Sequence, residues 1–257
     1  MGNLPETETA VLAAQKARYH YNLGMAPLVN LRSFLEAQGL MIFTIPFGNE
    51  QNAISGLFLS HSKLGNIIAI NQAPADTRLS FSLAHGLAHC LYQHDQPAIL
   101  CHHGVTNPLE CFAERFAAYF LIPSAALQER LHSLGVKRVR HPAEVVHLAH
   151  YFGVSYEEML IRLDLEHQLA GSQEDFKLIQ PARLSQNLGY SSSFEESGGR
   201  FLPLEKRLPR IFLELAYRAV LADKLSLRRV AEMLGISDIE LEERLFTSEQ
   251  TLEEIAS

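Results

Sequence analysis

Two histidines, His85 and His89, are the residues whose types and spacing most clearly suggest chemistry in this sequence. On a helix, side chains at positions i and i+4 lie on the same face, so both imidazoles could bind one metal ion. Glu110 follows them and opens a second apolar, helix-like run. Two histidines from one helix and a glutamate from another make a three-ligand zinc site whose fourth position is open to water or substrate.

The residue after the first histidine is Gly86. Zinc proteases with the H-E-x-x-H signature have a Glu at this position, and its carboxylate takes a proton from the zinc-bound water. Glycine inside a helix lowers helix stability by about 1 kcal/mol relative to alanine. A glycine at this position therefore calls for a structural or functional explanation. Either Gly86 allows close packing against a neighbouring backbone, or a functional Glu has been lost there.

A histidine pair alone also fits a structural role in a core or on a surface. The apolar residues Leu83, Leu87 and Leu91 favour a buried helix that presents the histidines inward. The sequence has three cysteines, Cys90, Cys101 and Cys111, and all lie in the same stretch as the histidines. A cysteine ligand is therefore conceivable, although Cys90 is expected to point away from the ligand face of its helix.

Three segments together resemble the ImmA/IrrE metallopeptidases. They read IIAIN at 67–71, RLSFSLAHGLAH at 78–89 and ECFAERFAAYFLIP at 110–123. Family members have an apolar strand ending in Asn, then Arg-x-x-Phe-Thr-Leu-Ala-His-Glu-x-x-His, and later Glu-x-x-Ala-Asn-x-Phe-Ala before a Pro. The resemblance is close over residues 67–123 and looser over most of residues 10–165.

This resemblance implies that His85, His89 and Glu110 bind Zn²⁺ and that position 86 would carry the general base. Glu114 stands where the family usually has Asn. Family members are generally linked to cleavage of a partner helix-turn-helix repressor, which switches on phage, mobile-element or stress genes. With Gly86, the chain resembles an impaired member of the family, and Gly86→Glu is expected to raise cleavage of its partner.

Two other functions stay open from the sequence. The first is a non-catalytic pseudopeptidase regulator that binds a repressor or a toxin through the former catalytic cleft. The second is a DNA-binding transcription regulator, which the net charge of −7 disfavours.

Residues 92–108 read as a polar connection between the two metal-binding helices. They contain three more histidines, His94, His102 and His103. These histidines are interpreted either as part of a solvated loop or as the source of one imidazole that polarises a substrate carbonyl.

The order of the elements predicts an α+β fold. Helical runs at 6–24 and 27–39 precede three β-branched runs at 40–47, 53–60 and 66–71, which predict a three-stranded sheet packed on the metal-binding helices. We expect a small zincin-like peptidase domain at 1–168 that ends in a helix-turn-helix-like segment near 141–168. Residues 169–208 are expected to be a linker, and 209–257 a C-terminal helical module that again resembles a helix-turn-helix.

Composition sets further bounds. With 47% apolar residues the chain can bury a substantial core, and no apolar run is long enough to predict a transmembrane helix. The first twenty residues contain no hydrophobic signal core, and the cysteines lack Cys-x-x-Cys spacing. Both features favour a cytoplasmic protein with reduced thiols.

Overall fold

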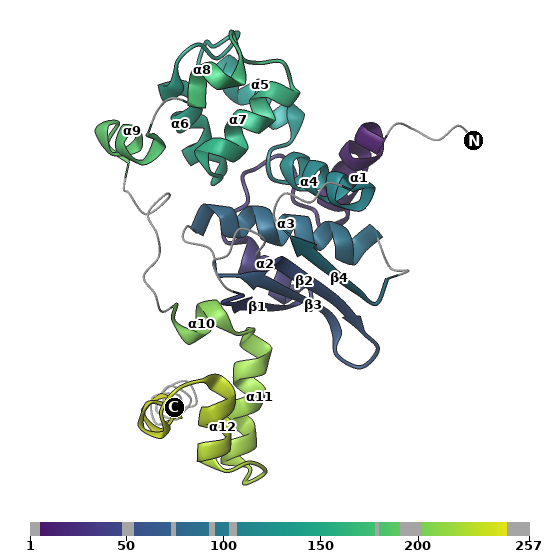
Figure 1. Cartoon of the computed structure of the whole chain (residues 1–257), viewed down its shortest axis with the longest axis vertical. Coiled ribbons are helices and arrows are strands. Elements are labelled where there is room, and N and C mark those ends of the chain that lie inside the picture. The colour runs from purple at the N-terminus through teal and green to yellow at the C-terminus, as the bar shows by residue number, and fades with distance from the viewer. Residues whose placement is uncertain are drawn as a thin grey trace, which may run out of the picture.

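The computed structural model describes residues 6–47, 54–72, 76–92, 96–102, 107–177, 180–190 and 202–245 (Figure 1). The strands are β1 (Met41–Ile45), β2 (Ile54–His61), β3 (Gly65–Asn71) and β4 (Ala98–His102). The helices are α1 (Glu6–His20), α2 (Leu31–Ala37), α3 (Asp76–Tyr92), α4 (Pro108–Leu121), α5 (Ser124–Ser133), α6 (Pro142–Phe152), α7 (Tyr156–Leu165), α8 (Gln173–Lys177), α9 (Pro181–Asn187), α10 (Leu204–Arg207), α11 (Arg210–Leu221) and α12 (Leu227–Leu234). Residues 238–245 are also helical. Strands and helices together confirm the predicted α+β class.

One mixed sheet has the strand order β1-β3-β2-β4. β1 is parallel to β3, whereas β2 is antiparallel to both β3 and β4. The prediction of three strands is wrong, because β4 lies within the segment expected to be a polar connection. This short strand exposes alternate residues. Its conformation is set by pairing with β2, a non-local contact that composition does not reveal.

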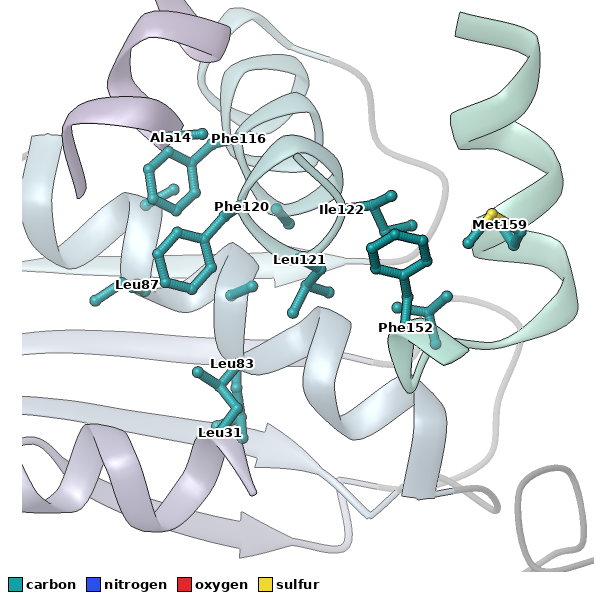
Figure 2. Close-up of a cluster of buried hydrophobic side chains, with 14 of the residues drawn as sticks. Ala14, Leu31, Leu83, Leu87, Phe116, Phe120, Leu121, Ile122, Phe152 and Met159 are labelled. Carbon is teal, nitrogen blue, oxygen red and sulfur yellow. The ribbon is translucent and has the colours of Figure 1, made fainter. Parts of the chain in front are cut away.

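Three helices are layered on the sheet. α3 packs against β2 and β3, and α4 packs between α3 and α1. Figure 2 shows Phe120 of α4 beside Leu87 of α3 and Phe116 beside Ala14 of α1, and all four side chains are fully buried. α1 meets α4 through small residues, including the buried Ala14, which lets the two helix backbones approach closely.

The same core continues into the helices that follow α4. Phe152 of α6 and Met159 of α7 are buried beside Ile122 (Figure 2). α6 and α7 form the predicted helix-turn pair, with Gly153 at φ 68° between them. A left-handed backbone of this kind is the usual position for glycine at a helix C-terminus.

The segment predicted as a linker is partly structured. It contains α8 and α9, and Phe176 of α8 is buried in the main core. The Ser/Gly-rich tract at 191–199 lies outside the described residues. The linker was predicted from this Ser/Gly-rich tract. α8 and α9 are short helices whose order comes from tertiary contacts.

The C-terminal helices have a separate hydrophobic cluster that includes Leu213, Val230, Leu234 and Leu241. α10 connects this cluster to the sheet because it packs against β1. Within the described ranges, no helix is both long and apolar enough to cross a lipid bilayer.

Candidate metal centre

α3 places His85 and His89 on its inner face, as their spacing predicted. Their Nε2 atoms lie 2.9 Å apart. His89 is almost fully buried, and the His85 side chain is 12% exposed. Leu83, Leu87 and Ala88 on the same helix are buried in the core. The helix therefore holds the two histidines on its buried side.

Glu110 reaches the histidines from the first turn of α4. Asn107 caps this helix by accepting a hydrogen bond of 3.0 Å from the Glu110 backbone N–H, and Pro108 begins the helix. The carboxylate Oε2 lies 3.1 Å from His85 Nε2, and Oε1 lies 3.7 Å from His89 Nε2. The structure therefore brings together the three residues that the sequence suggested as ligands.

A fourth donor, Cys101, completes the cluster from β4. Its Sγ lies 3.3 Å from His89 Nε2, 3.7 Å from His85 Nε2 and 3.1 Å from Glu110 Oε1. All four ligand atoms lie within 4.8 Å of one another. Sequence reasoning admitted a cysteine ligand but did not choose Cys101, because only the strand that it missed brings this residue to the helices.

The carboxylate and the thiol of the cluster have pKa values shifted in opposite directions from their ordinary values. Burial raises the pKa of Glu110, but hydrogen bonds with His85 and Cys101 and the nearby imidazoles outweigh it and lower that pKa below its ordinary value. Burial and the adjacent carboxylate raise the pKa of the Cys101 thiol. The thiol donates a hydrogen bond to the carboxylate. Two imidazoles, a thiol and a carboxylate are a donor set that suits zinc and related divalent metals.

Gly86 packs against an aromatic ring of the sheet. A Cβ atom built on Gly86 would lie 2.2 Å from Cε1 of Phe58, a buried residue of β2. The Phe58 ring also lies 4.8 Å from the ring centre of His89. Gly86 therefore permits close packing, as one of its two interpretations held, but the neighbour is a side chain rather than a backbone. The Phe58 ring therefore overlaps the position of the Cβ that a Glu at position 86 would have.

A cavity of about 110 Å³ opens beside the cluster. His85, Cys101 and Glu110 line one part of it, and Phe81, His102 and the exposed Glu114 line another. Of the three histidines in the predicted connection, His102 thus lies on the cavity wall. His94 and His103 lie outside the described residues.

The other two cysteines are free thiols that do not belong to this cluster. Cys90 is buried on α3, and burial raises its pKa to about 12. This position agrees with the expectation that Cys90 points away from the ligands. Cys111, on α4, is half-buried.

Comparison with known proteins places this geometry in a family. No curated protein matches the chain closely enough to be counted as a relative. The model of the IrrE N-terminal-like domain, Peptidase_M78, matches residues 35–164, just over half of the 257-residue chain. The match includes the sheet, α3, β4 and α4, and hence all four donors. The chain therefore belongs to the ImmA/IrrE family of metallopeptidase-type proteins.

Proposed function

We propose that this protein is a zinc-binding, catalytically impaired member of its family that regulates transcription by binding a protein partner. The observation that carries this proposal is the contact between Gly86 and Phe58. The position of the general base has no carboxylate, and the Phe58 ring overlaps the place where the Cβ of any side chain at position 86 would lie.

Bound zinc in a peptidase lowers the pKa of a water molecule and polarises the scissile carbonyl. Proton transfer in that reaction needs a base within hydrogen-bonding distance, and loss of a positioned base typically reduces the rate by about 10²–10⁴-fold. On α3 the residue after His85 cannot act in this way. His85, His89 and Glu110 retain the ability to hold the metal.

The partner that we propose is a helix-turn-helix repressor of phage, mobile-element or stress genes in the cytoplasm. Support comes from the family to which the chain belongs and from the cavity beside the metal centre. The cavity is open to solvent and combines the Phe81 ring with the polar side chains of Ser82 and Glu114. Such a mixed lining suits a peptide segment.

Co-expression of the chain with a candidate helix-turn-helix repressor tests this proposal. We expect a complex that survives size-exclusion chromatography and contains a repressor of intact mass. A matched variant, Phe81→Ala, should weaken the complex if the cavity takes part in binding, whereas Ile161→Ala on the exposed face of α7 should not. Repressor fragments would contradict catalytic impairment, and the absence of any complex would contradict the proposed partner.

A second candidate is an active peptidase that takes its base from α4. Glu114 lies one turn after Glu110 and lines the same cavity as His85. In this case Glu114→Gln would abolish repressor cleavage without removing the metal. If the protein is catalytically impaired, as proposed above, the repressor stays intact with both the parent and Glu114→Gln.

DNA binding by the C-terminal helices is less well supported. The helix at 238–245, which would enter the major groove, exposes Asp238, Glu242 and Glu243. Carboxylates on that face repel the phosphate backbone, which supplies most of the affinity of a DNA-binding protein. A shift of promoter DNA that weakens with salt would revive this alternative.

A further inference from the structure

Donor atoms from four residues gather around one point between α3, α4 and β4. The two histidine Nε2 atoms lie 2.9 Å apart, and Cys101 Sγ lies 3.3 Å from His89 Nε2 and 3.7 Å from His85 Nε2. Glu110 approaches through both carboxylate oxygens: Oε1 lies 3.1 Å from Cys101 Sγ and 3.7 Å from His89 Nε2, and Oε2 lies 3.1 Å from His85 Nε2. Tetrahedral zinc with bonds of about 2.0–2.3 Å holds its donor atoms about 3.3–3.6 Å apart. The separations among the two histidine nitrogens and the cysteine sulfur, 2.9–3.7 Å, are close to these values, and one carboxylate oxygen of Glu110 would complete the tetrahedron.

The fold aims Cys101 at this point. In β4, Ile99 and Cys101 are buried while Leu100 between them is exposed, so the cysteine is on the face that α3 covers. Cys101 pairs with Gly56 of β2, and the register shifts between Ile54 and Gly56. Irregularities of this kind bend a strand and redirect the neighbouring side chains.

We propose that Cys101 is the fourth protein ligand of the metal and that the site is closed. The thiol gives up its proton to solvent when its sulfur coordinates the ion. Four protein ligands leave no position for a catalytic water, which is the arrangement of structural zinc sites rather than catalytic ones. This inference rests on the metal binding proposed above. It assigns Cys101 to the fourth coordination position, which an active peptidase leaves open for water.

Cobalt(II) is the probe that tests the inference, because its spectrum reports ligand type and geometry. We expect the parent to bind one Co²⁺ with intense visible bands from a tetrahedral site and a near-ultraviolet sulfur-to-cobalt charge-transfer band. Cys101→Ser should lose the charge-transfer band and bind Co²⁺ about tenfold more weakly or worse, since loss of even an outer-shell partner has an effect of that order. Cys111→Ser, the matched control, should keep the parent spectrum.

Two outcomes separate this inference from the proposed function. Parent protein that binds Co²⁺ without a charge-transfer band would overturn the role of Cys101 and leave a three-ligand site. Parent protein that binds neither Co²⁺ nor Zn²⁺ would overturn the metal centre itself. Neither outcome depends on whether a repressor is bound or cleaved.

X-ray absorption spectroscopy of the zinc-loaded parent tests the same inference without a substitution, so the result does not depend on whether a variant folds. We expect one sulfur at about 2.3 Å and three nitrogen or oxygen ligands at about 2.0–2.2 Å from zinc. A shell that contains only nitrogen and oxygen would overturn the inference.

Discussion

At the scale of single residues, the Phe58 ring limits which side chains can stand at position 86, whatever their role in catalysis. Alanine in a helix interior is normally more stable than glycine by about 1 kcal/mol. Here its methyl group would overlap the Phe58 ring. We predict that Gly86→Ala lowers the free energy of unfolding by about 1–3 kcal/mol, the usual effect of overpacking. Urea unfolding of the metal-free protein would measure it.

A double-mutant cycle supplies the control for that prediction. In a Phe58→Ala background the ring is absent, so Gly86→Ala should stabilise the helix instead of destabilising it. The change of sign is the expected result. An equal effect of Gly86→Ala in both backgrounds would show that Phe58 does not restrict position 86.

The same contact changes what is expected of Gly86→Glu. From the sequence alone, this substitution should raise cleavage. The structure adds two obstacles, the Phe58 ring over position 86 and the Cys101 thiol among the metal donors. We predict that Gly86→Glu alone yields no cleavage of a bound repressor, as measured by intact mass. Gain of cleavage should require Phe58→Ala and Cys101→Ala in addition, and cleavage by the single variant would contradict both roles.

The sequence alone predicted the residues of this site that belong to helices with a regular apolar pattern. His85 and His89 are predictable because a helix repeats every 3.6 residues, and Glu110 because it opens a second apolar run. Cys101 and Phe58 were not predictable in the same way. Both lie on strands, and the pairing of β2 with β4 brings them to the helices from distant parts of the chain.

At the scale of elements, Arg162 attaches α7 to the end of α4. It is fully buried and donates hydrogen bonds to Ile122 O, Glu166 Oε1 and Ser124 Oγ. Its guanidinium also lies 3.8 Å from the ring centre of Tyr119. Removing one partner of a buried ion pair typically costs about 3–5 kcal/mol. We predict a loss of this size in the free energy of unfolding for Arg162→Ala, and almost none for the exposed Arg183→Ala.

Glu166, the ion-pair partner of Arg162, makes the stability of this contact depend on pH. Burial raises the pKa of Glu166, but hydrogen bonds from Ser124 and Arg162 and the arginine charge lower it below its ordinary value of 4.5. A depressed carboxyl pKa stabilises the fold above the unfolded value and loses this effect as pH falls through the folded value. The stability difference between the parent and Glu166→Gln should therefore be largest above pH 5 and shrink below pH 4.5. A difference that stays constant down to pH 3 would contradict it.

Elements with strong local signals were predictable, and those that depend on partners were not. The helices from α3 to α7 follow from apolar periodicity, caps and glycine stops, such as Ser155 and Gly153. β4 and α8 are too short for such signals. They are ordered by pairing with β2 and by burial of Phe176.

At the scale of the whole molecule, Arg32 joins the C-terminal helices to the sheet. This α2 residue donates hydrogen bonds to Ile42 O of β1 and to Lys206 O of α10, both at 2.6 Å. It also forms an ion pair with Glu36 at 3.0 Å. Phe43 of β1 contacts Phe212 of α11 edge to face, with ring centres 5.8 Å apart.

Arg32 thus lies at the junction between the sheet and the C-terminal helices, whose own core is separate from the main one. We predict that Arg32→Ala increases amide hydrogen exchange in α10 and the start of α11 while α3 and α4 keep their protection. The C-terminal core should stay folded, since Arg32 is not part of it. The exposed Arg218→Ala on α11 is the control and should leave the exchange of α10 unchanged. Uniform loss of protection across both cores would instead show that the two parts unfold as one unit, with Arg32 contributing to the stability of the whole.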